Sequence, residues 1–447
     1  MNISRSSVRR TVGNIFRRYS LLYRIYAAYA RIRRFGLKKQ KNIYNRNIIA
    51  FSDLINKLKQ EKAIIIGSEI IEKYDTEKKS ALLISHELSL SGAPIVLINL
   101  AKELMKIGFQ VIIMSPRETD DFIKMHDRDY YEVIPFVISD SLFESDLILS
   151  SATMFDYIFL NTICTAPLIR KFINTDINVI WWVHESNSLY TAYLAGMMPK
   201  VLSDNIKVYA VGSYARKIIE AKYPRYKVNE WMYFCPDISN YTLDIQVLKP
   251  VQEKKRIFAH IGSMGWRKGT DVFVDAIYML PRVMIESCLF VFVGVYLDEI
   301  AERKINEIQS RYPDSIIYTG SLSREKMYKL YKEIDYLVCA SRDDPMPLVV
   351  AEGMCDGVPC ICSENTGSAD IITKYKAGFV YKGNNSVKLA RELKKAFETK
   401  EEEYKNLSNN SRIAYEEVYS EEIFERRLKT ILRGQAGCFV SPGNNSG

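Results

Sequence analysis

The stretch CASRDDPMPLVVAEGM, residues 339–354, follows a short apolar segment and continues into a helical pattern predicted over Leu348–Cys355. Asp344 then stands before the helix and Glu352 just over one turn inside it, so both carboxylates can face one cleft. In parallel sheets, ligands bind beyond the carboxyl ends of the strands, which makes this loop a candidate site. The alternative interpretation is that Asp343 or Asp344 only caps the helix.

The same alternation of short apolar strands and amphipathic helices extends outward from this stretch, and it implies parallel sheets covered on both faces. In the second half of the chain, the predicted strands are 257–261, 289–293, 316–319, 336–339 and 359–362, with helices at 270–280 and 323–331. In the first half, they are 81–85, 109–114, 157–160, 179–183 and 208–211, with a helix at 94–107. We therefore expect an α/β protein with two doubly wound, Rossmann-like domains.

The chain has 447 residues, which is too long for one ordinary core and suits two such domains with extensions. The expected division is a basic amphipathic arm at 1–46, a linker or helical extension at 47–79, an N-terminal Rossmann-like domain at 80–240, an interdomain linker at 241–255, a C-terminal Rossmann-like domain at 256–432 and a flexible tail at 433–447. The pattern leaves open whether 47–79 joins the first domain.

Basic residues are concentrated at the N-terminus. The first 46 residues hold 13 Lys and Arg and no Asp or Glu, whereas the rest of the chain has a net charge of −4. Residues 19–35 have a helical apolar and aromatic face with arginines around it, which suits an anionic membrane surface. The alternative is that this helix packs on the protein's own body. No nucleic-acid partner is expected, because such binding needs basic residues across a folded face.

No apolar run approaches the roughly 18 residues of a membrane-spanning helix, and the N-terminus lacks the features of a signal peptide. We therefore expect a cytoplasmic protein, peripheral on the inner face of the cell membrane. Its eight cysteines are then predicted to be reduced. Cys355, Cys360 and Cys362 match no standard zinc spacing, so buried thiols are the preferred interpretation and no metal site is expected.

The loop Gly262–Gly269, sequence GSMGWRKG, directly follows a predicted strand and includes Ser263. It brings Arg267 and Lys268 together before a helix, an arrangement that suits a diphosphate because Arg offers a forked donor set and Lys a compact charge. A solvated basic turn is the alternative.

The first half offers two further candidate loops. Gly92, in the turn 89–94, would let the backbone approach an anion at a helix N-terminus, although any strand–helix turn can use glycine. His184 and Glu185 follow the buried strand 179–183, a position that favours a cleft. A histidine satisfied by neighbouring backbone is the other possibility.

Over residues 80–432 the sequence resembles the retaining glycosyltransferases of the GT4 type with the GT-B fold, in which two Rossmann-like domains face each other across a cleft. The resemblance rests mainly on Gly262–Gly269 and Ser341–Met354, in this order in the second domain. The opening HELSLSGAP, residues 86–94, resembles bacterial members that build surface polysaccharides and lipopolysaccharides.

The resemblance implies a role for each matching residue. Arg267 and Lys268 would hold the donor diphosphate, Glu352 the ribose hydroxyls, and Asp344 and His184 the transferred sugar. Backbone groups would line the rest of the donor: Gly92, Met346, Leu348 and Val349 near the sugar and phosphates, and Thr319–Leu322 near the base. Two residues depart from the family pattern: Asp344 is one methylene shorter than the usual glutamate, and Pro347 has no N–H where the family often has glycine.

The implied reaction is retaining transfer from a UDP- or GDP-linked sugar to a glycan or lipid-linked acceptor in cell-surface polysaccharide biosynthesis. The leaving diphosphate would help to deprotonate the acceptor, and the protein would mainly position groups and stabilise charge. Arg267 and Lys268 would do what a metal does in other enzymes, and no cofactor is expected beyond the donor. The alternatives are a sugar-nucleotide epimerase of the same fold or a non-enzymatic basic protein that binds membranes or nucleic acid through the arm 1–46.

Overall fold

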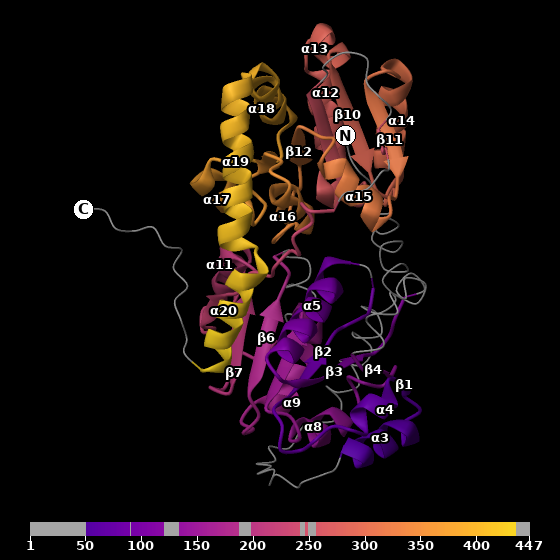
Figure 1. Ribbon diagram of the computed structural model, residues 1–447, viewed down its shortest axis with the longest axis vertical. Helices are drawn as coiled ribbons and strands as arrows, with labels where there is room; N and C mark the ends of the chain where they lie inside the picture. The colour runs from indigo at the N-terminus through magenta and orange to yellow at the C-terminus, as the bar shows by residue number, and fades with distance from the viewer. Residues whose placement is uncertain are drawn as a thin grey trace, which may run out of the picture.

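The computed structural model describes residues 51–89, 91–119, 134–186, 198–241, 246–248 and 256–434. The predicted arm at 1–46, most of the linker at 241–255 and the tail from residue 435 lie outside this set. Figure 1 shows two α/β domains stacked along the long axis, the first carrying β1–β8 and the second β9–β14. The prediction of two doubly wound domains is confirmed.

The first sheet has eight strands in the order β1-β4-β3-β2-β5-β6-β7-β8. All its pairings are parallel except that of β1 with β4. The central strands are apolar and buried over their length, as a sheet covered on both faces requires. The strands are β1 (Ile64–Ile66), β2 (Ser80–Ile84), β3 (Gln110–Ser115), β4 (Phe136–Ile138), β5 (Tyr157–Asn161), β6 (Val179–Val183), β7 (Ile206–Ala210) and β8 (Val228–Glu230).

Residues 51–79 belong to this first sheet and its covering layer. Helix α3 (Phe51–Gln60) buries Phe51, Leu54, Ile55 and Leu58, the three- and four-residue spacing of one helix face. Strand β1 then pairs with β4, and α4 (Ser68–Ile71) follows. The other described helices of this domain are α5 (Gly92–Lys106), α8 (Leu147–Ala152), α9 (Ala166–Phe172) and α11 (Ser213–Lys222), with a 3₁₀ turn, η1, at Ile163–Thr165.

The second sheet has six parallel strands in the order β11-β10-β9-β12-β13-β14. These are β9 (Arg256–Ile261), β10 (Cys288–Val293), β11 (Ile316–Gly320), β12 (Tyr336–Cys339), β13 (Cys360–Ser363) and β14 (Gly378–Tyr381). Its helices are α12 (Thr270–Tyr278), α13 (Arg282–Glu286), α14 (Glu299–Arg311), α15 (Arg324–Tyr331), α16 (Leu348–Cys355), α17 (Ala369–Tyr375), α18 (Ser386–Glu398) and α19 (Glu401–Val418), with a 3₁₀ turn, η2, at Trp266–Lys268.

The last described helix, α20 (Glu421–Leu432), leaves the second domain and packs on the first, beside β6 and β7 (Figure 1). Its Phe424 is stacked on Trp231, with ring centroids 5.2 Å apart, and Trp231 is stacked on Trp182 at 4.1 Å. The 256–432 segment therefore contributes to the core of both domains.

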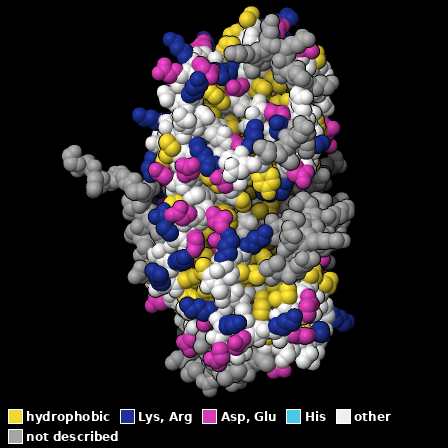
Figure 2. Space-filling model, in the orientation of Figure 1, with side chains coloured by type: hydrophobic (Ala, Val, Ile, Leu, Met, Phe, Trp, Pro, Cys, Tyr) yellow, Lys and Arg dark blue, Asp and Glu magenta, His cyan; other side chains and the backbone are white. Residues whose placement is uncertain are grey.

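The seven cysteines among the described residues are all buried and free, which matches the expectation of buried thiols. Among these residues, no helix combines the length and apolarity needed to cross a membrane. Figure 2 shows Lys and Arg interspersed with Asp and Glu over the face in view.

Candidate functional site

The basic loop after β9 is held against the end of β12. Gly269 has φ +70°, and a Cβ on it would lie 1.9 Å from the carbonyl oxygen of Ala340, so only glycine fits this approach. Arg267 donates from Nη1 to the carbonyl oxygen of Asp343 at 3.0 Å. The predicted basic and acidic loops are therefore in direct contact, although the residues involved lie 76 positions apart.

Arg342 holds these two loops together. Its guanidinium donates two hydrogen bonds to the carboxylate of Asp271, at 2.6 and 2.7 Å, and Nη1 also donates to the carbonyl oxygen of Trp266. The same group lies 4.9 Å from the centroid of the Trp266 ring. Three of the five N–H donors of Arg342 are used in this way, so its guanidinium links the basic loop to the acidic loop.

The acidic loop places Asp344 beside the basic one. Its Oδ2 lies 2.5 Å from Nζ of Lys268, and its side chain is buried. The helix α16 has Pro347 as its N-cap residue and no side-chain cap, so the alternative that Asp343 or Asp344 caps it is wrong. The first-turn amides of Leu348 and Val349 have no partner within the helix, as at any helix N-terminus.

Glu352 is 8% exposed and lies inside α16. Tyr331 donates its hydroxyl to Oε2 at 2.8 Å, and Nη2 of Arg324 lies 3.8 Å from Oε1. Burial raises the pKa of the Glu352 carboxyl, and the charge of Arg324 opposes this effect. The remaining acceptor capacity of the carboxylate suits hydroxyl groups of a ligand.

A cavity of about 230 Å³ opens beside Glu352 at the carboxyl ends of β9 and β10. Its lining comes from β9, β10, the loop 321–322, α15 and the start of α16, where Val349 contributes. Of the predicted segment 319–322, Ser321 and Leu322 line the cavity. Thr319 is not among the lining residues, and its hydroxyl donates to the carbonyl oxygen of Gly320 at 2.9 Å.

Three other residues predicted to bind the donor do not line this cavity. Met346 is buried, and its carbonyl oxygen accepts a hydrogen bond from Tyr233 of the first domain at 3.0 Å. Ser263 is half-buried in the basic loop. Gly92 begins α5, and a Cβ on it would have no atom within 4 Å, so the space beside it is open.

On the first-domain side, His184 follows β6 and packs against Trp182, with ring centroids 4.7 Å apart. Its Nε2 is buried without a hydrogen-bond partner in the described part of the chain. Burial, and secondarily the charge of His86, lowers the pKa of His184 to about 3, so the ring is neutral near pH 7. A neutral ring with one unpaired nitrogen is suited to a polar ligand atom.

Glu185 is directed into the first domain instead. Its Oε2 accepts the backbone N–H groups of Ile163 at 2.8 Å and of His184 at 3.1 Å. Burial raises the pKa of Glu185 to about 7 despite these bonds. The carboxylate therefore fixes the turn that presents His184.

Sequence reasoning missed residues that complete the site: Asp343, Arg342, Arg324, Tyr331 and Ser186. Arg324 carried a signal, because it is the second residue of the helix predicted at 323–331, after strand 316–319, and so lies at the ligand-binding edge. The bond between Ser186 and Asp343 spans 157 positions and has no signature in the sequence.

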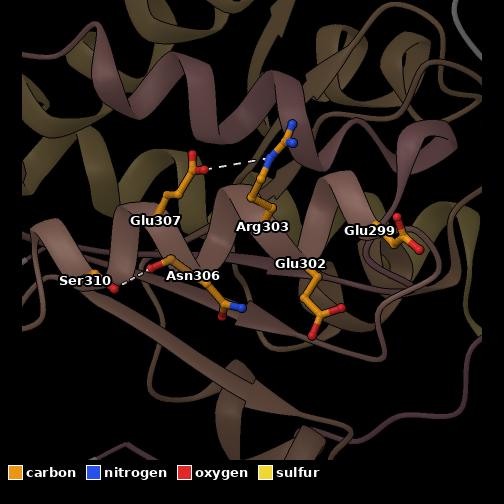
Figure 3. Close-up of a pocket in the computed structure, with 6 residues that line it drawn as sticks. All are labelled: Glu299, Glu302, Arg303, Asn306, Glu307 and Ser310. Atoms are coloured by element: carbon orange, nitrogen blue, oxygen red, sulfur yellow. Dashed lines mark hydrogen bonds and ion pairs between the residues drawn. The ribbon is translucent and has the colours of Figure 1, made fainter.

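A larger hollow, of about 660 Å³, lies elsewhere, on the outer face of α14 (Figure 3). All six residues drawn come from this one helix, and they include the exposed pair Arg303 and Glu307, 3.8 Å apart. Because a single helix face lines it, the hollow is open surface. No group of three or more His, Cys, Asp or Glu side chains suited to a metal ion occurs within the described ranges.

Two family models match the chain in tandem. Residues 77–210 match the model described as glycosyl-transferase family 4, and residues 245–414 match glycosyl transferases group 1. Together the two matches cover more than half of the chain, and one falls on each of its two sheets. The chain belongs to the GT-B glycosyltransferases.

Relatives of this GT-B chain are distant. It is 28% identical over 186 residues to glycogen synthase of Thermodesulfovibrio yellowstonii, a match that covers 39% of this chain and 37% of that protein. It is 19% identical over 252 residues to the putative glycosyltransferase YtcC of Bacillus subtilis, which covers 52% of this chain and 62% of YtcC. The chain thus spans little more than a third of the length of the first of these relatives.

Solved GT-B structures share the fold over most of the chain. HepE of Anabaena, in complex with UDP, has a TM-score of 0.60 and 14% identity, covering 80% of this chain and all of HepE. WaaG, a glycosyltransferase involved in lipopolysaccharide biosynthesis, has a TM-score of 0.58 and 15% identity, covering 79% of this chain and all of WaaG.

Proposed function

We propose that this GT-B protein is a retaining glycosyltransferase that moves a sugar from a UDP- or GDP-linked donor to a glycan or lipid-linked acceptor in cell-surface polysaccharide biosynthesis. One observation carries the proposal: Arg267, Lys268 and Asp344 meet at the same edge of the second sheet as the cavity that contains Glu352. Cations for a diphosphate and carboxylates for hydroxyls are what a nucleotide sugar requires.

In this proposal, the nucleoside occupies the cavity, with Glu352 accepting from the ribose hydroxyls. Arg267 and Lys268 hold the diphosphate and stabilise its charge as it leaves. Asp344 and His184 contact the transferred sugar from opposite domains. The leaving diphosphate takes the proton of the acceptor hydroxyl on the face where the new bond forms, so that the anomeric configuration is retained.

The donor class is supported by the solved structure of HepE with UDP-glucose, a protein of the same fold. The acceptor class is supported by WaaG, a glycosyltransferase of the same fold that is involved in lipopolysaccharide biosynthesis. We also propose that the arm at 1–46, which lies outside the described residues, binds an anionic membrane surface on the cytoplasmic side through its 13 basic residues.

The decisive experiment is a thermal-shift or saturation-transfer NMR titration of the full chain with a panel of UDP-, GDP- and ADP-sugars. We expect selective binding of one donor, which Arg267→Ala/Lys268→Ala abolishes while the protein stays folded by circular dichroism. A folded wild-type protein that binds none of the panel would overturn the proposal.

Two activity assays on the same protein test the reaction itself. The donor alone should be hydrolysed slowly and never isomerised, whereas an epimerase would convert it without an acceptor. Transfer should persist in EDTA, because Arg267 and Lys268 supply the positive charge at the diphosphate. Complete loss of transfer in EDTA, restored by Mg²⁺, would contradict this assignment.

A further inference from the structure

The carboxylate of Asp343 receives two hydrogen bonds from the first domain. Ser186 donates its hydroxyl to Oδ1 at 2.5 Å, and Tyr214 donates its hydroxyl to the same oxygen at 3.3 Å. Ser186 is 1% exposed, so this bond is shielded from water. Both residues lie at the carboxyl edge of the first sheet. Ser186 is in the loop after β6, and Tyr214 is at the start of α11, after β7.

Asp343 belongs at the same time to the donor turn, which we define as residues 343–347. Its carbonyl oxygen accepts from Arg267, and the next residue, Asp344, pairs with Lys268. Two other first-domain contacts reach this turn. Tyr233 donates to the carbonyl oxygen of Met346, and a Cβ on Gly212 would lie only 2.5 Å from Cε of Met346.

On the first-domain side, Ser186 lies close in sequence to a proposed sugar contact. It follows His184 by two residues, in a turn where the Glu185 carboxylate accepts a hydrogen bond from the backbone N–H of His184. One carboxylate therefore connects the turn that presents His184 to the turn that presents Asp344. Burial raises the pKa of Asp343, and the Ser186 hydroxyl and the charge of Arg267 oppose that effect.

We propose that Asp343 is a positioning residue that fixes the first-domain turn of His184 relative to the donor turn, so that closure of the two domains assembles the sugar-contacting groups. This inference rests on the proposed function and adds a residue that has no assigned role in it. Both first-domain hydroxyls bind Oδ1 of Asp343, and its main-chain carbonyl oxygen binds Arg267, so these contacts act on the position of the turn.

The chain supplies a matched control. Ser213 donates its hydroxyl to Asp370 at 2.7 Å, a hydrogen bond that also joins the two domains but lies outside the donor turn and is exposed. Ser213→Ala therefore removes an interdomain hydroxyl without touching Asp343. The test variants are Ser186→Ala and Tyr214→Phe, each of which removes one donor to Asp343, and Asp343→Asn.

The first measurement needs no ligand: hydrogen–deuterium exchange of the peptide 343–349 in the full-length protein. We expect Ser186→Ala to speed its exchange by about tenfold, the effect of one lost buried hydrogen bond. Ser213→Ala should leave it unchanged. Equal exchange in wild type and Ser186→Ala, or equal acceleration in both variants, overturns the proposal.

The second measurement is kinetic and uses the nucleotide sugar selected by the binding panel. We expect Ser186→Ala and Asp343→Asn to lower kcat by about tenfold and to raise the ratio of donor hydrolysis to transfer, with the donor dissociation constant within about threefold of wild type. Unchanged kcat in both variants overturns the role of Asp343. If the wild-type protein binds no nucleotide sugar, the proposed function is overturned. The exchange measurement then still decides whether Asp343 couples the turn of His184 to the donor turn.

Discussion

The ammonium nitrogen of Lys268 lies 2.5 Å from Oδ2 of Asp344, so two charges proposed to contact the donor neutralise each other before it binds. This pair is mostly shielded from water, where an unpaired charge is costly. A diphosphate that approaches Lys268 must compete with Asp344, which then becomes free to accept from a sugar hydroxyl.

Asp344→Asn tests this competition. We expect kcat/KM to fall by about 100-fold or more, because the amide cannot stabilise positive charge developing on the sugar. The affinity for the free nucleoside diphosphate should stay equal or increase a few-fold, because Lys268 loses its competing partner. Isothermal titration and initial-rate kinetics measure the two effects.

Asp275→Asn is the control for Asp344→Asn, since Asp275 pairs with Lys304 in the same domain, away from the cavity. It should change neither quantity. Parallel loss of nucleotide affinity and activity in Asp344→Asn would mean that Asp344 only supports the fold of the loop.

Glu352→Gln tests the proposed ribose contact. The substitution keeps the size of the side chain but replaces a charge-assisted acceptor, so we expect nucleotide affinity to fall by about 10- to 100-fold, or about 1.4–2.8 kcal/mol. Tyr331→Phe should cost less affinity, because it removes only the hydroxyl that positions Oε2. A 2′,3′-dideoxy nucleotide should bind wild type and Glu352→Gln equally; a large remaining difference would argue against a ribose contact.

Phe424→Ala tests the packing of α20 on the first domain. Phe424 is 1% exposed and is stacked on Trp231, so truncation should lower the free energy of unfolding by about 3–5 kcal/mol. The buried Trp181, Trp182 and Trp231 report on the first domain by fluorescence during urea unfolding. A loss below about 1 kcal/mol would show that α20 adds little to this core.

Protonation of His260 predicts that the free energy of unfolding falls as the pH is lowered. Its ring is buried, with Nδ1 2.9 Å from the carbonyl oxygen of Val338, and burial lowers its pKa from 6.5 to about 4. Between these values the unfolded chain binds a proton that the folded ring rejects, so stability is full above pH 6.5 and falls as the pH drops toward 4. The cost is about 1.4 kcal/mol at pH 5.5.

In His260→Asn, the number of protons taken up on unfolding between pH 5 and 6.5 should fall by about one. The free energy of unfolding, measured with urea, should therefore depend less on pH in this range, whatever the substitution does to stability at pH 7.5. His86 and His184, with pKa values lowered to about 4 and about 3 by burial, act in the same direction as His260. Glu185, with a pKa raised to about 7, acts in the opposite direction between pH 4.5 and 7. An unchanged slope in His260→Asn would contradict a neutral ring.

Much of the fold follows from local patterns. The strands predicted at 179–183 and 336–339 and the helix at 348–355 have the same bounds in the structure, because apolar runs with clear ends define them. The three-residue strands β4 and β8 were not predicted, since their segments are too short for any periodicity to emerge. Helix α14 was also missed, because it is largely polar and buries only Ala301, Ile305 and Ile308.

For the candidate site, local patterns likewise predict some residues but not the contacts between them. Asp344, Glu352, Arg267 and Lys268 could be chosen because each lies in a loop or helix start that follows a strand. The partners of Arg267, Lys268 and Asp343 depend on how loops 76 positions or more apart meet, as in the bond from Arg267 to Asp343 and the contacts of Asp343 with Ser186 and Tyr214. Such contacts follow from tertiary packing, which leaves no local pattern.

The return of α20 to the first domain has a consequence for biosynthesis. Trp182 and Trp231 are made long before Glu421, where α20 begins, so the emerging first domain lacks the helix that covers its indole rings. At ordinary ribosomal speeds this interval lasts on the order of 10 s. We therefore expect the nascent chain to expose an aromatic surface, to which chaperones can bind, until translation reaches α20.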